Sequence, residues 1–323
     1  MRLTGKADTS GMLIPCQAWK QEGVTTTSQE GTHAVQFRMG KRRAPRIVGE
    51  DIVYSPRKRG TRVTAGNGKS TLCGTLLLSA IEQGHSVCAA SMELPATKFR
   101  EWIDLQAAGS EFITTKWDPV KGCEVPVVYP PAAKRIADWY HGKFFLFENV
   151  DAPTTTIADA ILDVFTMAAK RKGCDVFCVD NLMTALMDSG DDEYRAQGVF
   201  MANLKRFAIK YNSHVIVVAH PRKVKKGETF TQDDVGGTKY ISNLASNVIV
   251  VEKPDLRIIK SRDSGQLRLI TCCYCGDSRR IYQADVGDKY VFSWDRTGLT
   301  PPQKKASELP GYGIYMSTQN QMF

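Results

Sequence analysis

The stretch Gly66-Asn67-Gly68-Lys69-Ser70-Thr71 has the composition of a loop that binds phosphate groups. Glycines suit such a loop because its backbone N–H groups must turn toward phosphate oxygens, and a Cβ would block that approach. In this role Lys69 would reach the β- and γ-phosphates of ATP, and the Ser70 hydroxyl would bind Mg²⁺. The complete pattern begins with a glycine five positions before Gly68, where this chain has Val63. The alternative is a glycine-rich turn that precedes Lys-Ser by chance.

Three further polar residues stand at or just past the C-terminal ends of apolar segments that we interpret as buried strands: Glu93, Asp180 and His220. Because the carboxyl ends of parallel strands meet at one edge of a sheet, we expect these residues and the glycine-rich loop to share one rim. There Asp180 would hold the Mg²⁺ of a nucleotide, and Glu93 would polarise the water that attacks the γ-phosphate. His220 would sense that phosphate.

Each of these residues also has a purely structural interpretation. The helix dipole favours a glutamate in a first helical turn, and Pro95 opens a helix beside Glu93. Acidic residues commonly end strands, and a strand-end histidine often bonds to backbone. For His220 alone the structural interpretation is the stronger one, and for Asp180 alone the two are balanced. The prediction of a site therefore depends on the combination.

Two groups of basic residues lie further along the chain. The first is a loop without apolar periodicity that contains Arg222, Lys223, Lys225 and Lys226. Such a loop suits contact with the phosphate backbone of a nucleic acid, and its alternative is a solvated turn. The second is the pair Lys260 and Arg262. Residues two apart on an extended segment point to the same side, so this pair could reach the nucleotide of a neighbouring subunit. Its alternative is a solvated hairpin tip.

Composition narrows the class of protein. The chain has 323 residues, ordinary apolar and charged fractions, and a formal net charge of +9, which favours an anionic partner. Nine cysteines are scattered, several of them within apolar runs, which is typical of reduced intracellular thiols. Cys272-Cys273-Tyr274-Cys275 reads as strand residues rather than a metal site, because no second Cys/His pair is near. The chain shows no secretory signal and no apolar run of membrane-spanning length, so we expect a cytoplasmic protein of a bacterial or phage-infected cell. Location in a mitochondrion or another organelle is the alternative.

From residue 61 onward, apolar runs alternate with amphipathic helical patterns. The strands expected from these runs lie at 86–90, 143–147, 175–180, 214–220, 247–251, 256–260 and 267–270. The helices expected between them lie after Ser70, at 95–108, from Ile157 to just before Gly173, and at 199–211. Residues 110–142 contain four prolines and suggest an inserted loop or short helices. The alternation predicts a largely parallel sheet that is covered on both faces.

The motifs and their order resemble those of the RecA-like ATPase domain of hexameric replicative DNA helicases, the group of DnaB, Twinkle and the phage primase-helicases. The resemblance covers residues 61–285. It is carried by five segments: Asn67-Gly68-Lys69-Ser70-Thr71, Ser91-Met92-Glu93-Leu94, Val179-Asp180-Asn181-Leu182, Ala219-His220-Pro221-Arg222-Lys223 and Lys260-Ser261-Arg262. Any one of these motifs would be weak, whereas their order is specific.

The resemblance implies an α/β fold: a RecA-like P-loop NTPase core with a mostly parallel sheet, helices on both faces and a C-terminal β-hairpin region. It implies ATP and Mg²⁺ as cofactors, with Glu93 as catalytic base and His220 facing the γ-phosphate. Arg262 would act across the subunit boundary as arginine finger, with Lys260 as companion. The nucleotide would be held by Gly66, Asn67, Gly68, Lys69, Ser70, Thr71 and Asp180, and the metal by Ser70 and Asp180.

The function implied is a replicative DNA helicase that hydrolyses ATP between subunits of a homo-hexamer and moves along single-stranded DNA. A separate primase or helicase loader is a further implied partner. We divide the chain into a basic arm or linker at 1–60, the ATPase domain at 61–298 and a polar tail, expected to be disordered, at 299–323. Val63 and the unusual N-terminus keep open a non-hydrolysing DNA-binding accessory protein. A RecA/RadA-type ATPase in a filament is the other alternative, and Lys260 and Arg262 count against it.

Overall fold

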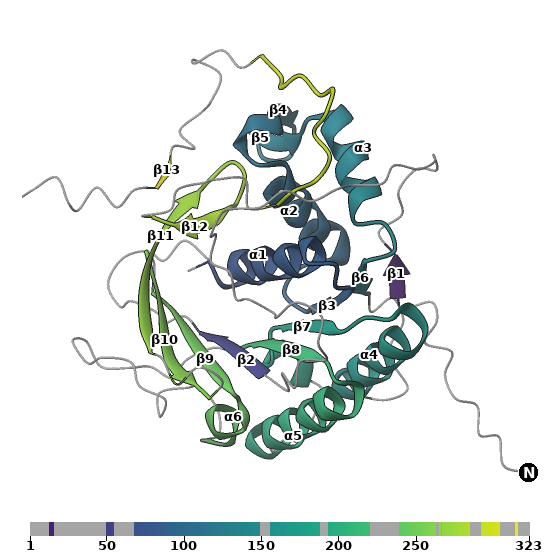
Figure 1. The fold of residues 1–323 in the computed structure, drawn as a ribbon, viewed down its shortest axis with the longest axis vertical. Coiled ribbons are helices and arrows are strands. Elements are labelled where there is room, and N and C mark those ends of the chain that lie inside the picture. Colours follow the sequence, from purple (N-terminus) through teal and green to yellow (C-terminus); the bar gives the residue numbers. More distant parts are fainter. Residues whose placement is uncertain are drawn as a thin grey trace, which may run out of the picture.

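A single eleven-stranded sheet forms the centre of the protein (Figure 1). The computed structural model describes residues 13–15, 50–54, 68–148, 156–187, 193–219, 239–252, 254–262, 265, 267–284, 292–303 and 314–315. The strands follow the order β1-β6-β3-β7-β8-β2-β9-β10-β11-β12, and β13 pairs with β11. The central strands β6, β3, β7, β8, β2 and β9 are all parallel, whereas β1 and the strands beyond β9 pair antiparallel.

The strands of this sheet are β1 (Leu13–Pro15), β2 (Glu50–Tyr54), β3 (Val87–Ser91), β6 (Phe144–Phe147), β7 (Val176–Asp180), β8 (His214–Val218), β9 (Asn247–Glu252), β10 (Asp255–Ser261), β11 (Arg268–Cys275), β12 (Ile281–Gln283) and β13 (Ile314–Tyr315). A separate hairpin consists of β4 (Ile113–Asp118) and β5 (Cys123–Val128). The α-helices are α1 (Lys69–Glu82), α2 (Ala96–Ala108), α3 (Pro130–Trp139), α4 (Ile157–Lys172), α5 (Glu193–Tyr211) and α6 (Lys239–Leu244). Short 3₁₀ turns are η2 (Ser110–Phe112) and η3 (Thr184–Leu186).

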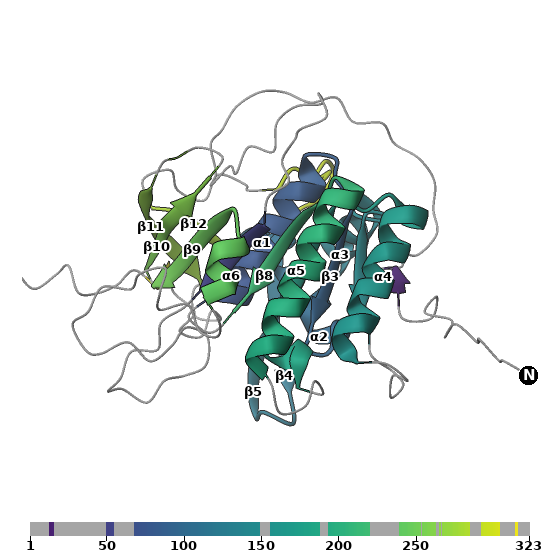
Figure 2. The ribbon, with the colours of Figure 1, turned by 90° about the horizontal axis from the view of Figure 1, so that it is seen from below.

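Helices cover both faces of the parallel part of the sheet (Figures 1 and 2). The helices α1, α2 and α3 lie on one face, and α4 and α5 lie on the other. The alternation of side chains along each buried strand explains this arrangement. In β7, for example, Val176 and Cys178 belong to the core under α1, whereas Phe177 and Val179 belong to the core under α5.

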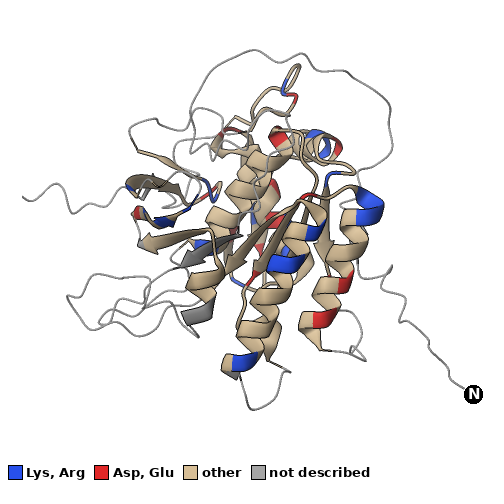
Figure 3. Ribbon diagram, turned by 60° about the horizontal axis from the view of Figure 1, so that its bottom comes forward, with Lys and Arg blue, Asp and Glu red and all other residues tan. Residues whose placement is uncertain are grey.

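Local sequence determines where α4 begins and ends. The Thr156 hydroxyl accepts a hydrogen bond from the backbone N–H of Asp159 at 3.2 Å, and Gly173 ends the helix in the left-handed conformation. An acidic residue occupies the first turn, and Lys170, Arg171 and Lys172 occupy the last turn (Figure 3). This distribution of charge complements the helix dipole. Within the described ranges, none of the helices combines the length and the apolar character that crossing a membrane would need.

The predicted fold class is confirmed: the sheet is mostly parallel, both faces are covered, and antiparallel strands follow at the C-terminal end. The segment 110–142, expected to form an inserted loop or short helices, forms the short helices η2 and α3 and, in addition, the hairpin β4–β5, which was not predicted. The sequence analysis did not predict the sheet strands β1, β2, β12 and β13. Both β1 and β2 lie within 1–60, and β2 occupies the middle of the sheet between β8 and β9.

The C-terminal part of the chain packs back over α2. The buried Arg280 side chain donates from Nε to the carbonyl of Gln106 at 2.7 Å and from Nη2 to that of Ala107 at 3.1 Å. Trp294 Nε1 also donates to the Ala107 carbonyl, at 2.8 Å. These bonds satisfy carbonyls at the end of α2 that have no partner within the helix. These hydrogen bonds hold the turn between β11 and β12 against α2, on the face of the sheet that α1 also covers.

A half-buried carboxylate between α2 and α3 makes the stability of this layer dependent on pH. Asp104 accepts a hydrogen bond from the Tyr140 hydroxyl at 2.5 Å, and Arg100 lies 3.7 Å from its other oxygen. Burial raises the pKa of Asp104 to about 6, and the bond from Tyr140 only partly opposes this shift. A carboxyl group whose pKa is raised on folding contributes stability below its unfolded pKa, and this is lost as the pH rises through about 6.

We therefore predict that Asp104→Asn stabilises the protein at pH 8 by on the order of 1–3 kcal/mol, because an amide accepts the Tyr140 bond without a buried charge. The gain should disappear at pH 4, where the wild-type carboxyl is protonated as well. Urea unfolding at the two pH values measures the effect, with Asp163→Asn on the exposed face of α4 as control. Equal stability of Asp104→Asn and wild type at pH 8 would contradict the prediction.

Candidate functional site

The glycine-rich loop ends where α1 begins. Gly68 has the left-handed φ of 89°, and its carbonyl accepts the backbone N–H of Leu72 at 2.8 Å, which starts the helix at Lys69. The partly buried residues Lys69, Ser70 and Thr71 thus form the first turn of α1, where free backbone N–H groups favour an anion. The predicted residues Gly66 and Asn67, and the departure at Val63, lie outside the described residues.

Two residues that the sequence analysis did not select support this loop. The buried ring of Tyr274 in β11 packs on Gly68, and a Cβ at Gly68 would lie 2.7 Å from Tyr274 Cε1. The buried Gln106 of α2 donates from Nε2 to the carbonyl of Thr71 and to that of Arg279, both at 2.8 Å. The first turn of α1 is therefore bound to α2 and to the β11–β12 turn at once.

Asp180 ends β7 directly beside the first turn of α1. Its side chain is 2% exposed, and burial raises its pKa to about 6. A hydrogen bond from Ser70 lowers that pKa, the charge of Glu93 raises it, and the charge of Lys69 lowers it. Ser70, Glu93 and Lys69 are all close enough to act on Asp180, so the structure brings these four predicted residues together at one rim of the sheet.

Glu93 lies just beyond β3 and is held from β7. The side-chain Nδ2 of Asn181 donates to Glu93 Oε1, and Asn181 Oδ1 accepts the backbone N–H of Thr184 at 2.9 Å. The Asp180 carbonyl accepts the N–H of Met92 at 2.6 Å, which joins the ends of the two strands. Asn181 is 1% exposed whereas Glu93 is exposed. A fixed amide thus orients a carboxylate that faces solvent.

The oxygen groups at this rim fit a magnesium ion and a nucleotide. Carboxylate and hydroxyl oxygens are the ligands that Mg²⁺ prefers, and Ser70 and Asp180 supply one of each. The buried Oδ2 of Asp180 has no hydrogen-bond partner within the described part of the chain, so it retains capacity for a ligand. The left-handed Gly68 and the N-terminus of α1 beside it suit the phosphates.

Lys260 and Arg262 lie at the rim of the sheet where the parallel strands begin, opposite the rim with Glu93 and Asp180. In the register, Lys260 pairs with Val248 and Ser261 with Asn247 at the start of β9, and Asn247 pairs with Asp51 near the start of β2. The glycine-rich loop follows the other end of β2. The structure therefore does not bring this predicted pair to the site of its own chain. The remaining predicted residues, His220, Arg222, Lys223, Lys225 and Lys226, lie outside the described residues.

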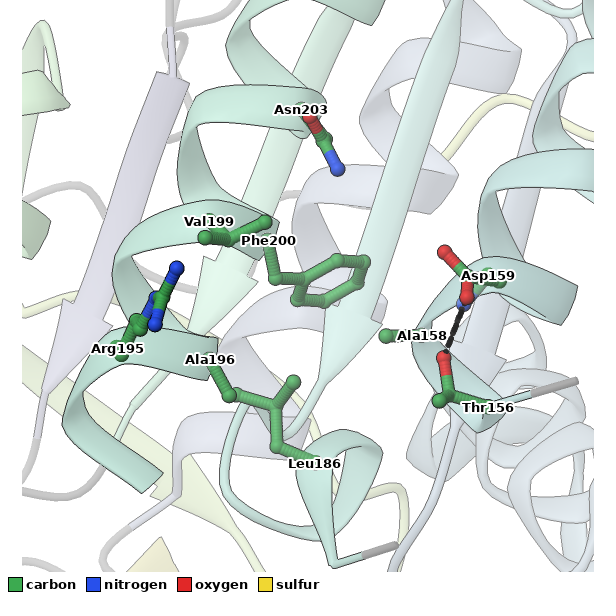
Figure 4. A pocket seen from close by; sticks show the side chains of 9 residues that line it. All are labelled: Thr156, Ala158, Asp159, Leu186, Arg195, Ala196, Val199, Phe200 and Asn203. Atoms are coloured by element: carbon green, nitrogen blue, oxygen red, sulfur yellow. Dashed lines mark hydrogen bonds between the residues drawn. The ribbon is translucent and has the colours of Figure 1, made fainter. Parts of the chain in front are cut away.

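A cavity of about 380 Å³ lies between α4, η3 and α5 (Figure 4). Its lining combines apolar residues such as Leu186 and Phe200 with polar ones such as Thr156, Arg195 and Asn203. Of the predicted site residues that the structure describes, none lines it. The site described above is therefore separate from this cavity.

The comparisons with known proteins agree with the fold. A family model described as an AAA domain matches residues 64–226, half of the chain. The solved ATPase domain of G40P superposes with a TM-score of 0.56 at 12% identity, covering 73% of this chain and 84% of that chain. A DnaB-like replicative helicase, whose structure was described together with its interactions with primase, superposes with a TM-score of 0.55 at 12% identity. The match covers 72% of this chain and 58% of that chain. This chain thus spans less than two thirds of that helicase, and no curated protein matches it by sequence.

These likenesses confirm the predicted resemblance: the chain has the RecA-like fold of helicase ATPase domains. At 12% identity they show the fold alone, and the roles of the individual site residues remain predictions.

We predict that Gly68→Ala destabilises the protein more than Gly84→Ala. Both glycines have a left-handed φ, 89° and 93°, but a Cβ at Gly84 would meet nothing within 4 Å. The shared backbone strain should cost about 1–2 kcal/mol, and the collision with Tyr274 should add about 1–3 kcal/mol. Urea unfolding of both variants measures the difference.

The double variant Gly68→Ala/Tyr274→Ala tests the cause. If the collision with the ring is responsible, the additional cost of Gly68→Ala disappears when Tyr274 is already absent. Equal costs at Gly68 and Gly84 in the wild-type background would show that Tyr274 does not constrain the loop.

Proposed function

The chain belongs to the AAA domain family, and from this premise we propose that it is an ATP-hydrolysing motor of the replicative helicase type that acts on single-stranded DNA. The observation that carries the proposal is the meeting of Lys69, Ser70, Glu93 and Asp180 at one rim, at the N-terminus of a helix. Cation, hydroxyl and carboxylates in this arrangement suit the transfer of a phosphoryl group to water.

In the proposed mechanism, the first turn of α1 and the loop before it bind the phosphates of ATP. Gly66, Asn67, Gly68 and Thr71 provide backbone N–H groups, and the ammonium of Lys69 approaches the β- and γ-phosphates. Ser70 and Asp180 would hold Mg²⁺, which neutralises charge on the phosphate oxygens when it is bound.

Glu93 is the proposed general base. Its carboxylate faces solvent, so a water molecule can reach it, and the amide of Asn181 fixes its orientation. Glu93 accepts a proton as this water attacks the γ-phosphate. The role of Asn181 is to position Glu93 rather than to contact the substrate. His220, in the family motif, would face the γ-phosphate and report its loss.

Hydrolysis in this proposal requires two subunits. Lys260 and Arg262 lie at the rim where the parallel strands begin, and Asp180 lies where they end. They would therefore need a large rearrangement to contact the nucleotide of their own chain. We propose that Arg262, accompanied by Lys260, reaches the nucleotide bound by the next copy in a ring, a homo-hexamer by analogy with the family. An arginine supplied by a neighbour can raise the rate by orders of magnitude.

The proposed track for DNA is the basic loop that contains Arg222, Lys223, Lys225 and Lys226. Charges that contact the phosphate backbone bind without preference for sequence and weaken steeply with salt. The DnaB-like helicase that superposes on this chain was solved with respect to its interactions with primase. A separate primase or a loader is therefore a proposed partner here as well.

The first test is the ATPase rate with and without single-stranded DNA, on the wild type and on Lys69→Ala. We predict that DNA stimulates the wild type and that Lys69→Ala lacks activity under both conditions. The absence of hydrolysis in the wild type would contradict the motor proposal. Nucleotide binding without hydrolysis would favour the non-hydrolysing accessory protein that Val63 keeps open.

A second test concerns Asn181. We predict that Asn181→Ala lowers kcat about tenfold with little change in KM, because it removes the orientation of the base and not a contact to the nucleotide. Glu93→Gln should lower kcat further, and Asn203→Ala on α5 serves as control. If Asn181→Ala changed both KM and kcat as much as Asp180→Ala does, the proposed positioning role of Asn181 would be wrong.

A further inference from the structure

The hairpin β4–β5 presents an apolar tip to solvent. Figure 2 shows this hairpin projecting from the body of the domain. Near the end of β4, Trp117 is 60% exposed, and in the turn that follows, Val120 is 94% exposed. Single exposed apolar residues are common on protein surfaces, but tryptophan is enriched in the contacts between proteins. A tryptophan and a valine at the end of a projecting hairpin therefore indicate an interaction surface.

Hydrogen bonds within the turn hold this tip in a fixed shape. Asp118 Oδ1 accepts the backbone N–H of Val120 at 2.9 Å and that of Lys121 at 3.2 Å. Gly122 has a left-handed φ of 64° and donates its N–H to the Asp118 carbonyl at 2.9 Å. A tip that is already ordered loses little conformational entropy when it binds, which favours its use in a contact.

The cavity between α4, η3 and α5 has a chemistry that suits an indole side chain (Figure 4). Its volume of about 380 Å³ lies in the range of about 300–1,000 Å³ that bound ligands occupy. The buried side chains of Leu186 and Phe200 supply apolar surface at its centre. Asp159 stands on the α4 side and Arg195 stands on the α5 side. The cavity thus combines an apolar centre with an anion and a cation on opposite walls.

The hairpin and the cavity lie on opposite faces of the sheet (Figure 1). At the base of the hairpin, Phe112 and Ile113 belong to the core under α1, whereas Leu186 and Phe200 belong to the core under α5. The tip of one chain therefore cannot enter the cavity of the same chain, but a second copy presents the same cavity to it. A contact between two different surfaces of identical copies is heterologous, and its repetition gives a ring or a filament.

The charges beside the tip are complementary to those of the cavity. The strand register pairs Glu124 directly with Trp117, so both side chains stand on the same face of the hairpin. Lys121, in the turn, carries the opposite charge. With the indole of Trp117 in the cavity, Glu124 can pair with Arg195. Lys121 can pair with Asp159 in the same arrangement. A buried indole N–H needs an acceptor, and the carboxylate of Asp159 has oxygens for both donors.

We propose that the tip of the β4–β5 hairpin of one copy docks into the cavity between α4 and α5 of a second copy, with Trp117 as the anchor. A tryptophan that fills a partner's pocket is a typical centre of binding energy. This contact adds a surface to the assembly that we proposed from Lys260 and Arg262. It involves no nucleotide, so it does not rest on the proposed ATPase activity.

Self-association without nucleotide or DNA tests the contact by sedimentation velocity over a range of protein concentrations. We predict that Trp117→Ala raises the dissociation constant at least about tenfold, because it truncates the anchor. Val199 is an exposed residue of the cavity lining, so Val199→Trp should fill the cavity and weaken association as much. The double variant should lose no more than either single variant, because both changes remove one contact. Ile209→Ala, on the same helix and 55% exposed, is the matched control.

A wild type that stays monomeric at every concentration would overturn the proposal, as would a Trp117→Ala protein that associates like the wild type. If Trp117→Ala left self-association unchanged but lost affinity for a single-stranded oligonucleotide, the tip would belong to a nucleic-acid surface instead, and the proposal would again be wrong. Urea unfolding of each variant separates loss of the contact from loss of folding.

A chemical cross-link identifies the two surfaces that meet. Cys123 lies at the tip and is exposed, so its thiol is accessible to a short bismaleimide. Each thiol adds across one maleimide double bond, with the sulfur on one carbon and the proton on the other. We predict that Val199→Cys forms covalent dimers and larger species in which residue 123 of one copy is linked to residue 199 of another. Ile209→Cys should give much less product, and Val199→Cys/Cys123→Ser should lack this link. Its absence from the peptide masses of Val199→Cys would overturn the proposal.

Charge reversal tests the orientation of the tip in the cavity. We predict that Glu124→Arg and Arg195→Glu each weaken self-association, and that the double variant regains most of it, because the pair is restored with opposite signs. Recovery in the double variant cannot result from misfolding. If the double variant were as weak as the sum of the two changes, the proposed pairing would be wrong. None of these results depends on ATP hydrolysis, so they are distinguishable from failure of the proposed motor.

Discussion

The parallel register of the central strands is the constraint on which the candidate site depends. It brings the ends of β3 and β7 to one edge of the sheet, where Glu93 and Asp180 meet the first turn of α1. These residues are far apart in the sequence and come together only because parallel strands finish at the same level. Both faces of the sheet are buried under helices, so a slip in register would misplace every apolar side chain at once. The apolar core thus determines the position of the polar groups.

Around this rim, a second set of buried polar residues fixes the reactive ones. Gln106 joins the first turn of α1 to α2 and to the β11–β12 turn, and Asn181 joins the end of β7 to Glu93. Both amides are almost fully buried, so their hydrogen bonds are costly to break. Each makes contacts on two sides, which restricts the rotation of the group that it supports. Lys69, Ser70 and Glu93 are exposed or half-buried, whereas Asp180 and the two amides that support the rim are buried.

The sequence predicted the reactive residues of the site but not the residues that hold them in place, such as Gln106 and Tyr274. Lys69, Ser70, Glu93 and Asp180 were predictable because each chemistry requires a particular residue type at a strand end or a helix start. Gln106 and Tyr274 act through contacts between distant segments, and nothing local in the sequence indicates such partners. The strand β2 was missed because Glu50–Tyr54 is short and is followed by basic residues, so its neighbours in the sheet, and not its own pattern, make it a central strand. The hairpin β4–β5 was missed because its prolines suggested a loop, although Pro126 pairs with Thr115 within the hairpin.

The central position of β2 has a consequence for how the chain acquires its structure during synthesis. Val53 pairs with Val218 on one side, and Tyr54 pairs with Val250 on the other. The strand β2 is therefore synthesised long before either of the strands with which it pairs. Pairings of such long sequence separation form slowly because a large loop must close before any bond is gained. The central sheet is therefore incomplete until β9 has left the ribosome. A nascent chain that stops before β9 would expose the edge of β2, which is a ready template for association with another chain.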